Sequence, residues 1–165
     1  MSLSKEEQFW SATRAGDLAV VKKLATDSTL NINWRGEFGC TAFNIACSGG
    51  HVSVVQFLLT LPTVEIDEPM NLGFTPFFFA CHEGRKEVVS LLLADMRIDV
   101  NAAENTGTPF FIACQQSHKE VVSLLLADTR IEVNKRDNSQ RTPLGCLTIW
   151  PPASCPAHFG FWEAR

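Results

Sequence analysis

The segment "TPFFFACHEGRKEVVSLLLA", residues 75–94, decides the fold because the chain contains it more than once. A near-identical copy, "TPFFIACQQSHKEVVSLLLA", begins at Thr108, and a looser copy, "TAFNIACSGGHVSVVQFLLT", begins at Thr41. A last start, "TPLGCLT", begins at Thr142, so the starts at 41, 75, 108 and 142 lie 34, 33 and 34 residues apart. Self-similarity at such a period indicates an array in which each unit stacks on its neighbours.

A further unit precedes these copies and lacks their Thr-Pro start. In "FWSATRAGDLAVVKKLA", Phe9 matches Phe43 and Gly16 matches Gly50, in both cases 34 residues apart. The one-residue slip between the second and third full copies falls in the loop "NAAENTG", and loops are where a stacked array tolerates a deletion.

Each unit predicts two short helices and a loop. Thr75 suits a helix N-cap and Pro76 suits the first helical position, and we expect this helix to end near Glu83. Gly84 supplies the turn into a second helix, "KEVVSLLLAD", with an apolar stripe along one face. The stripe consists of Val88, Val89, Leu92 and Leu93. The following "RIDVN" alternates apolar and polar residues, which predicts an extended and half-buried segment.

The repeated unit resembles the ankyrin repeat, whose typical sequence reads T-P-L-H-x-A-A-x-x-G-H-x-E-V-V-x-L-L-L followed by G-A-D-V-N. The resemblance covers residues 8–144. It implies an all-α solenoid of stacked helix-turn-helix units with protruding loops, followed by an irregular C-terminal tail. The histidine of the pattern is Asn44, Phe78 and Phe111 in this chain, so the resemblance also implies that the family's Thr–His hydrogen bonds are missing.

The period divides the chain into a repeat domain, residues 1–144, and a tail, residues 145–165. Within the domain we expect a capping unit, three full units and the start of a fourth. Their ranges are 4–40, 41–74, 75–107 and 108–141, with the fourth unit beginning at 142.

The tail, "WPPASCPAHFGFWEAR" in its last part, interrupts the pattern with three prolines that forbid a regular second helix. Three arrangements stay open: the tail caps the last unit, is disordered, or fills the groove as an internal ligand. A truncated or alternative product of a longer array is also open.

Three consecutive phenylalanines raise the question of what covers them. Phe77, Phe78 and Phe79 point about 100° apart around a helix, whereas a stripe that faces one core is only ~100° wide. By the resemblance, Phe77 belongs to the core, Phe78 lies near the seam with a neighbouring unit, and Phe79 faces a concave groove.

The Phe79 position holds Ile45 and Ile112 in the other copies, so the three side chains are expected to form an exposed apolar stripe in the groove. Contiguous exposed apolar area often marks a binding site. One alternative is a rotated helix that buries Phe79 and exposes Phe78, and another is a loop that covers Phe79.

By the same resemblance, loop tips beside the groove supply the polar part of partner recognition. Trp34 is notable because aromatic residues are common interface anchors, although packing against Phe38 within its own loop is an equal alternative. The candidate loop residues are Trp34, Arg35, Met70, Leu72, Glu104, Lys135 and Asp137.

The cysteines and histidines suggest structure rather than chemistry. Cys47, Cys81 and Cys114 recur with the period at a position that needs a small apolar side chain. His51 and His118 recur near the start of the second helix, and the tail residues Cys146, Cys155 and His158 are too few and too loosely spaced for a zinc site. We therefore expect no catalytic residue, no metal and no cofactor.

Composition narrows the class of partner. The net charge is −4 and basic residues are scattered, which disfavours nucleic acid. There is no signal-peptide pattern and no apolar run of membrane-spanning length. The six cysteines are expected to be reduced thiols, which predicts a protein of the cytoplasm or nucleus. We also expect a monomer. The expected function is a non-catalytic module that binds a partner protein through the groove and loop tips. The alternatives are a structural fragment without binding activity and a thiol or metal site in the tail.

Overall fold

The computed structural model describes residues 3–102, 107–143 and 145 of the 165-residue chain. Within these ranges it contains eight α-helices and one short 3₁₀ helix, Glu37–Gly39. The α-helices are α1 (Lys5–Arg14), α2 (Leu18–Leu24), α3 (Ala42–Gly49), α4 (Val52–Leu59), α5 (Pro76–His82), α6 (Lys86–Leu93), α7 (Pro109–Gln115) and α8 (Lys119–Leu126).

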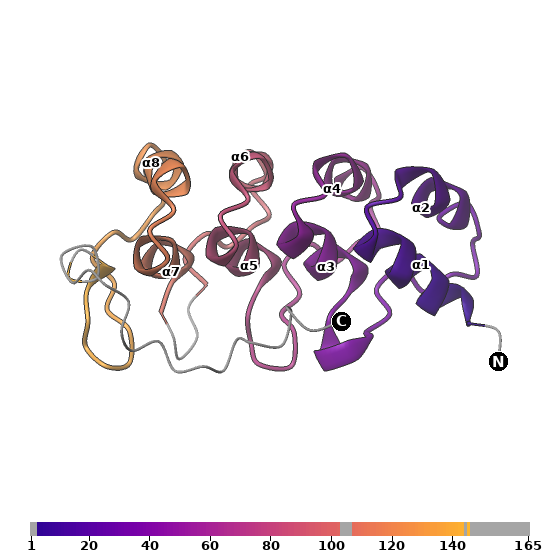
Figure 1. The fold of residues 1–165 in the computed structure, drawn as a ribbon, viewed down its shortest axis with the longest axis horizontal. Helices are drawn as coiled ribbons and strands as arrows, with labels where there is room; N and C mark the ends of the chain where they lie inside the picture. The colour runs from indigo at the N-terminus through magenta and orange to yellow at the C-terminus, as the bar shows by residue number, and fades with distance from the viewer. Residues whose placement is uncertain (1–2, 103–106, 144, 146–165) are drawn as a thin grey trace.

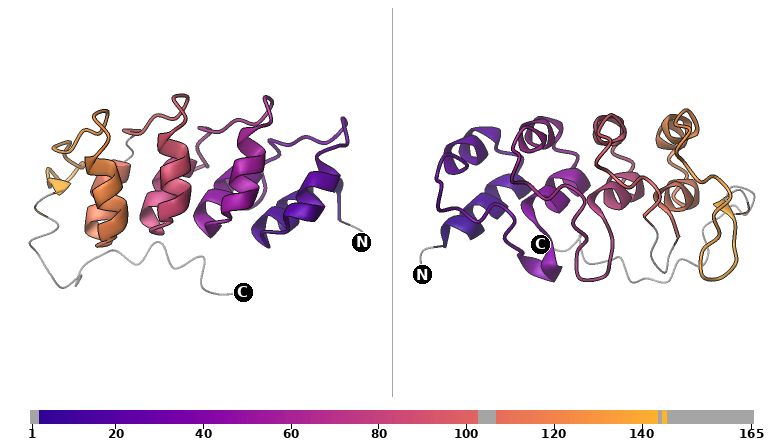
Figure 2. Two further views of the ribbon diagram at one scale, coloured as in Figure 1. Left: turned by 90° about the horizontal axis from the view of Figure 1, so that it is seen from above. Right: turned by 180° about the vertical axis from the view of Figure 1, so that it is seen from behind.

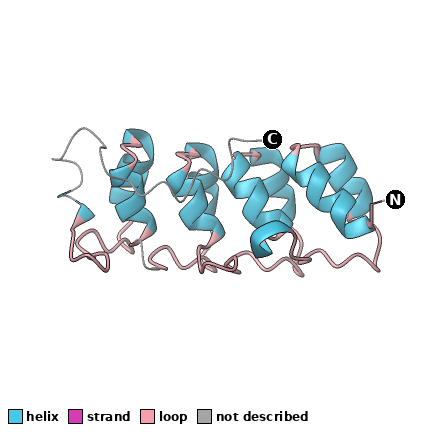
Figure 3. Ribbon diagram, turned by 60° about the horizontal axis from the view of Figure 1, so that its bottom comes forward, coloured by secondary structure: helices cyan, strands magenta, loops and turns pink. Residues whose placement is uncertain are grey.

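The helices form two parallel rows, as Figure 1 and Figure 2 show. The inner row holds α1, α3, α5 and α7, and the outer row holds α2, α4, α6 and α8. Each helix contacts its partner in the other row and its neighbours in its own row. The loops that join one pair to the next all project along the same side of the array (Figure 3). The predicted all-α solenoid of stacked pairs is therefore confirmed.

The inner helices start where the repeated threonines predict. The Thr75 hydroxyl accepts a hydrogen bond from the Phe78 N–H at 3.2 Å, and Pro76 occupies the first turn. The Thr108 hydroxyl accepts from the Phe111 N–H in the same way, at 3.1 Å. Each bond satisfies one of the N–H groups that a helix start leaves without a partner, and such a cap contributes about 1 kcal/mol.

The first full unit has a richer cap than the sequence predicts. The Asn44 side-chain oxygen accepts from the N–H and the hydroxyl of Thr41, at 2.8 and 2.7 Å. The Asn44 amide also donates to the Glu68 carbonyl in the loop that follows α4, at 3.2 Å. Asn44 thus ties the inner helix to the loop at the end of its own unit. The family's Thr–His hydrogen bonds are missing, as the resemblance implies, and in this unit Asn44 bonds Thr41 in place of a histidine.

The second and third units bury a phenylalanine instead of a polar group at that position. Phe78 is stacked on Phe74, with ring centroids 4.7 Å apart, and is fully buried. Phe111 is also fully buried. The alternative in which Phe78 is exposed is wrong, because aromatic packing takes the place of the hydrogen bonds.

The turns between paired helices need left-handed backbone. Gly50 and Gly84 adopt φ values of +75° and +66° there, and glycine carries no steric penalty in this region. Ser117 occupies the same position in the third unit with φ +62°. A residue with a Cβ costs roughly 1–2 kcal/mol in this conformation, so the last turn is strained relative to the turns formed by glycine, which include Gly16 at φ +72°.

The hydrophobic core runs continuously between the two rows. Two outer helices bury most of the predicted stripe: Val54, Val55 and Leu58 in α4 match Val88, Val89 and Leu92 in α6, and all are fully buried. The fourth predicted residue of the stripe, Leu93, is only partly buried. In the segment after α6, Ile98 and Val100 are buried between exposed neighbours, as the alternation predicts.

The described part of the chain ends at the start of another inner helix. The Gly145 N–H donates to the Thr142 hydroxyl at 3.2 Å, as the capping threonines accept in the other units. The predictions for the tail concern residues 146–165, which lie outside the described residues.

Candidate interaction surface

Three of the loops that link units share a backbone hydrogen bond across their base within the described residues. The donors are the N–H groups of Gly36, Met70 and Asp137, each bonded to the carbonyl four residues later at 2.9 to 3.1 Å. The equivalent positions at the loop tips are Phe38, Leu72 and Ser139. Because the closing bonds lie at the base, the tip residues project away from the helices.

The first two loop tips present large apolar side chains to solvent. Leu72 is 66% exposed and Phe38 is 47% exposed. The Asn71 N–H donates to the Phe38 carbonyl at 3.2 Å, so the two tips touch. Phe38 adopts φ +55°, a left-handed conformation that is unfavourable for a bulky residue. The first two tips therefore lie beside each other, and we call their exposed apolar residues, Phe38 and Leu72, the tip pair.

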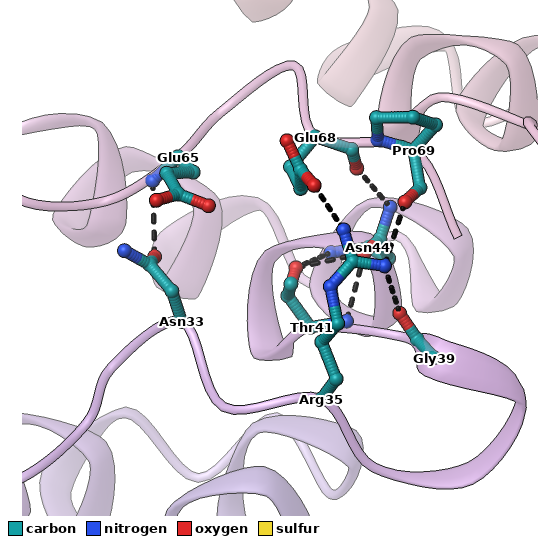
Figure 4. Close-up of polar contacts among 8 residues, drawn as sticks. All are labelled: Asn33, Arg35, Gly39, Thr41, Asn44, Glu65, Glu68 and Pro69. Carbon is teal, nitrogen blue, oxygen red and sulfur yellow. Dashed lines mark hydrogen bonds and ion pairs between the residues drawn. The ribbon is translucent and has the colours of Figure 1, made fainter. Parts of the chain in front are cut away.

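Arg35 joins the first loop to the second beneath the tip pair. Its guanidinium donates to the Gly39 carbonyl at 3.3 Å and to the Pro69 carbonyl at 3.0 Å. It also forms an ion pair with the Glu68 carboxylate (Figure 4). These contacts give Arg35 a positioning role, and its predicted contact with a partner stays a prediction.

A second connection between units repeats along the array at the loop entrances. The Asn33 amide donates to the Thr63 carbonyl at 2.8 Å, and its oxygen accepts from the Glu65 N–H at 3.0 Å (Figure 4). Asn101 bonds the backbone of the following unit in the same manner, at 2.6 and 2.8 Å. Asp67 occupies the intervening position. We call this series the amide ladder.

Asp67 makes only one of the two hydrogen bonds that Asn33 and Asn101 make in the amide ladder. Its Oδ2 accepts from the Asp99 N–H at 3.1 Å, whereas its Oδ1 is buried without a hydrogen-bond partner among the described residues. Burial raises the pKa of Asp67 above its ordinary value; the hydrogen bond from the Asp99 N–H opposes this rise, and the nearby Asp99 charge adds to it.

The predicted apolar stripe of the inner row is not exposed. Ile45, Phe79 and Ile112 have 4%, 3% and 2% of their surface accessible. The Phe79 ring packs edge-on against Phe74 and Phe78, with centroids 5.9 and 6.0 Å apart. The prediction of an exposed stripe is wrong, because each inner helix is short and has neighbours on several sides.

Two further loop candidates are also buried. The Met70 side chain lies in the core. The Asp137 carboxylate accepts from the backbone N–H and the guanidinium of Arg141, at 2.8 and 2.7 Å. Both side chains therefore hold their loops in place, and their predicted exposure at the loop tips is wrong.

The remaining loop candidates have mixed positions. Trp34 is half-buried against the core, and a side chain at Gly36 would meet the Trp34 ring at 2.9 Å. Lys135 pairs with Glu132 at 3.0 Å. Glu104 lies outside the described residues.

The residue at the recurring histidine position, which precedes each outer helix, bonds the end of the inner helix in the preceding unit. His51 Nε2 lies 2.9 Å from the Arg14 carbonyl, and His118 Nε2 lies 2.7 Å from the His82 carbonyl. Arg85 donates to the Ser48 carbonyl at 2.8 Å in the unit between them. Each side chain thereby caps the end of the preceding inner helix. The predicted structural role at the start of the second helix is confirmed.

A small polar cluster lies where α5 ends. His82 Nδ1 lies 2.8 Å from the Glu83 carboxylate, and Arg85 is 4.0 Å from the same carboxylate. The hydrogen bond to His82 lowers the pKa of Glu83, since it favours the charged carboxylate. The geometry fits an ion pair at a helix end.

The repeated cysteines are buried small side chains. Burial raises the pKa of Cys47 and Cys81 well above that of an ordinary thiol, which keeps them protonated and unreactive. Among the described residues, no group of three or more His, Cys, Asp or Glu side chains is arranged to hold a metal ion. Cys146, Cys155 and His158 lie outside these residues.

Comparison with known families agrees with this architecture. Residues 9–104 match a model of ankyrin repeats in three copies, and residues 107–138 match a model of the ankyrin repeat. The chain belongs to the ankyrin repeat family. Ankyrin repeats generally serve protein–protein interaction and are generally non-catalytic. No curated protein matches this ankyrin chain.

Within the described ranges, none of the helices combines the length and the apolar content that a bilayer crossing requires.

Proposed function

We propose that the chain is a protein-interaction module that contacts its partner through the tip pair, Phe38 and Leu72. The observation that carries this proposal is the exposure of two large apolar side chains on adjacent loops that touch each other. A single exposed apolar residue is ordinary, but a joined pair raised on loops fits an interface anchor.

The surroundings of the tip pair support the same proposal. Arg35 and its partners fix the two loops relative to each other, so binding orders little additional backbone. The left-handed conformation of Phe38 is a second sign, because unfavourable backbone conformations concentrate at functional sites. The inner-row positions Ile45, Phe79 and Ile112 are buried and are not part of the proposed contact surface.

The proposal predicts a clear loss of binding on substitution. Burial of a leucine side chain contributes about 1.5–3 kcal/mol, so Leu72→Asp should weaken partner binding by at least ~10-fold. Because Leu72 is exposed, the variant should keep the helical circular dichroism and the stability of the wild type.

A crosslinking experiment tests this with a matched control. A photoreactive amino acid is placed at position 72 in one sample and at position 96 in the other, since Met96 is also exposed but follows an outer helix. In cells that express the chain, position 72 should yield a discrete crosslinked protein that position 96 does not, and Phe38→Asp should abolish the product. Equal products from both positions, or none from position 72, would contradict the proposal and favour a structural array fragment.

A further inference from the structure

The contacts between successive outer helices follow one plan throughout the array. Val21, Val55 and Val89 occupy the same position in α2, α4 and α6, and each is fully buried in a helix that contacts the next outer helix. After each full outer helix, the segment with Ile66 or Val100 is buried in the same way. The chain therefore shows several times which sequence packs against an outer helix: the next outer helix and the segment that follows it.

Arginine from the following unit completes the end of α4 and of α6. Arg130 donates to the Leu93 carbonyl at the end of α6, at 2.7 Å, while Asp128 holds its guanidinium. Arg97 reaches the Leu59 carbonyl at the end of α4, at 3.5 Å, and Asp95 holds it. An Asp-x-Arg sequence after one outer helix thus caps the preceding outer helix.

The N-terminal end of the array is closed by its own side chains. The Glu6 carboxylate accepts from the Asn31 N–H at 3.4 Å, at the backbone position that the amide ladder serves in later units. Lys5 pairs with Asp27 and donates to Thr29 at 3.0 Å. This end therefore presents charged groups and satisfied backbone.

The C-terminal end of the outer row is open and apolar. Leu126 is 59% exposed and Val133 is 38% exposed, although the equivalent Leu93 is partly buried and Val100 is buried. Val122 is partly exposed, whereas its counterparts in the other outer helices are fully buried. Asn134 continues the amide ladder and is exposed. We call these four residues, Val122, Leu126, Val133 and Asn134, the end face.

At this end of the array, the residues after α8 already pack on the inner helix α7. A ligand of the end face therefore has to contact only the outer row. The Arg141 guanidinium lies over the Phe111 ring at 5.4 Å from its centroid. Thr142 starts a further inner helix, as its hydrogen bond from Gly145 shows. Among the described residues α8 is the last outer helix in the row (Figure 1). Within the described residues, no further outer helix packs on α8 or on the segment that follows it.

We propose that the end face binds an amphipathic helix of a partner protein, followed by an Asp-x-Arg turn and a short extended segment. We infer the sequence of this ligand from the contacts that successive outer helices make within the chain. The helix supplies a Val-Val and Leu-Leu stripe for Val122 and Leu126, the arginine caps the Leu126 carbonyl, and the extended backbone pairs with the Asn134 amide. This site is separate from the tip pair and goes beyond the proposed function.

A peptide of known sequence serves as the probe. Labelled "KEVVSLLLADTRIEVN", which is residues 119–134 of this chain, contains the helix, the turn and the extended segment. Fluorescence anisotropy of this peptide on titration with the full chain should show saturable binding. Leu126→Lys in the full chain should weaken binding at least ~10-fold, because it places a charge where a leucine stripe packs. Val133→Lys should act in the same direction.

Controls separate the end face from general stickiness and from misfolding. Met96→Lys, another exposed position, should leave binding unchanged, and all variants should retain wild-type thermal stability. A peptide with alanine in place of its arginine should bind more weakly. The proposal is overturned if the wild-type chain shows no saturable binding, or if Leu126→Lys binds as tightly as wild type. Binding seen only in a chain that ends at Gly145 also overturns it, because the rest of the chain would then occupy the face.

Discussion

Replacement of Asp67 by asparagine should stabilise the array, because it completes the broken step of the amide ladder. Asn33 and Asn101 each both accept and donate, whereas the Asp67 carboxylate can only accept. The side chain introduced by Asp67→Asn would keep the bond from the Asp99 N–H. By the register of the other two steps, it would also donate to the Arg97 carbonyl.

The size of the effect follows from the buried Oδ1 of Asp67. A buried polar atom without a partner costs about 1–3 kcal/mol, and a new hydrogen bond contributes about 0.5–1.5 kcal/mol. The two terms overlap, so we expect Asp67→Asn to raise the free energy of unfolding by ~1–2 kcal/mol at pH 7. For a urea dependence of ~2 kcal/mol per molar, the midpoint should rise by roughly 0.5–1 M.

The dependence on pH provides an independent check. The pKa of Asp67 is raised in the folded chain, so the folded state binds the proton more tightly than the unfolded state. The stabilising contribution of the protonated group is present below the unfolded pKa and is lost as pH rises through the folded pKa. Protonated Asp67 can donate as asparagine does. The advantage of Asp67→Asn should therefore shrink as pH falls from about 7 toward about 4.

Urea unfolding followed by tryptophan fluorescence measures both quantities, and the reciprocal variant Asn33→Asp is the matched control. It places a carboxylate at an intact step and should lower stability by a similar ~1–3 kcal/mol at pH 7. Other carboxylates lose their contributions at low pH in every variant, so they cancel in the difference. An unchanged midpoint for Asp67→Asn, or a difference from wild type that persists at the low end of the pH series, would refute the reasoning.

Other substitutions test the strained turn, the buried phenylalanine and the buried thiols. Ser117→Gly should stabilise by ~0.5–1 kcal/mol in urea unfolding, because φ is +62° there; the reverse change Gly84→Ser should cost more than that gain, since its Cβ would meet the His118 ring at 2.5 Å. Phe79→Asp should cost more than about 4 kcal/mol and leave little helical circular dichroism, and a folded, stable variant would contradict its burial. The buried cysteines are Cys40, Cys47, Cys81 and Cys114. With Cys146 and Cys155 replaced by serine, a thiol reagent at about pH 8 should react only as the chain unfolds, and rapid labelling of the native chain would exclude the assigned burial.

Much of the fold was predictable because it depends on local rules that repeat. Threonine followed by proline starts α5 and α7, and the spacing of Val88, Val89 and Leu92 fixes the buried face of the outer helix. These signals act within a few residues of each other, so the sequence alone contains them. Their recurrence at a fixed period then implies the stacking that gives a marginal helix pair its stability.

The surface was less predictable because exposure depends on residues far away in the sequence. The spacing of Phe79 shows which way it points around the helix, but not that Phe74 and Phe78 pack against it. Arginine is a residue type that often contacts partners, but the Arg35 guanidinium instead donates to the Pro69 carbonyl and pairs with Glu68 of the next unit. A sign was available for the tip pair, since Phe38 and Leu72 lie 34 residues apart and are apolar where Ser139 is polar.

Departures of the chain from its own repeat fall into two physical kinds, and the difference has consequences for binding. Asp67 leaves a buried side-chain oxygen without a partner and Ser117 adopts a left-handed backbone, so both lower stability without exposing a new group. Phe38 also carries an unfavourable backbone conformation, but it presents an aromatic side chain beside Leu72. Only the second kind produces a surface that a partner can recognise. Repair of the first kind should therefore strengthen the fold and leave binding unchanged, whereas Phe38→Gly should relieve the backbone and weaken binding.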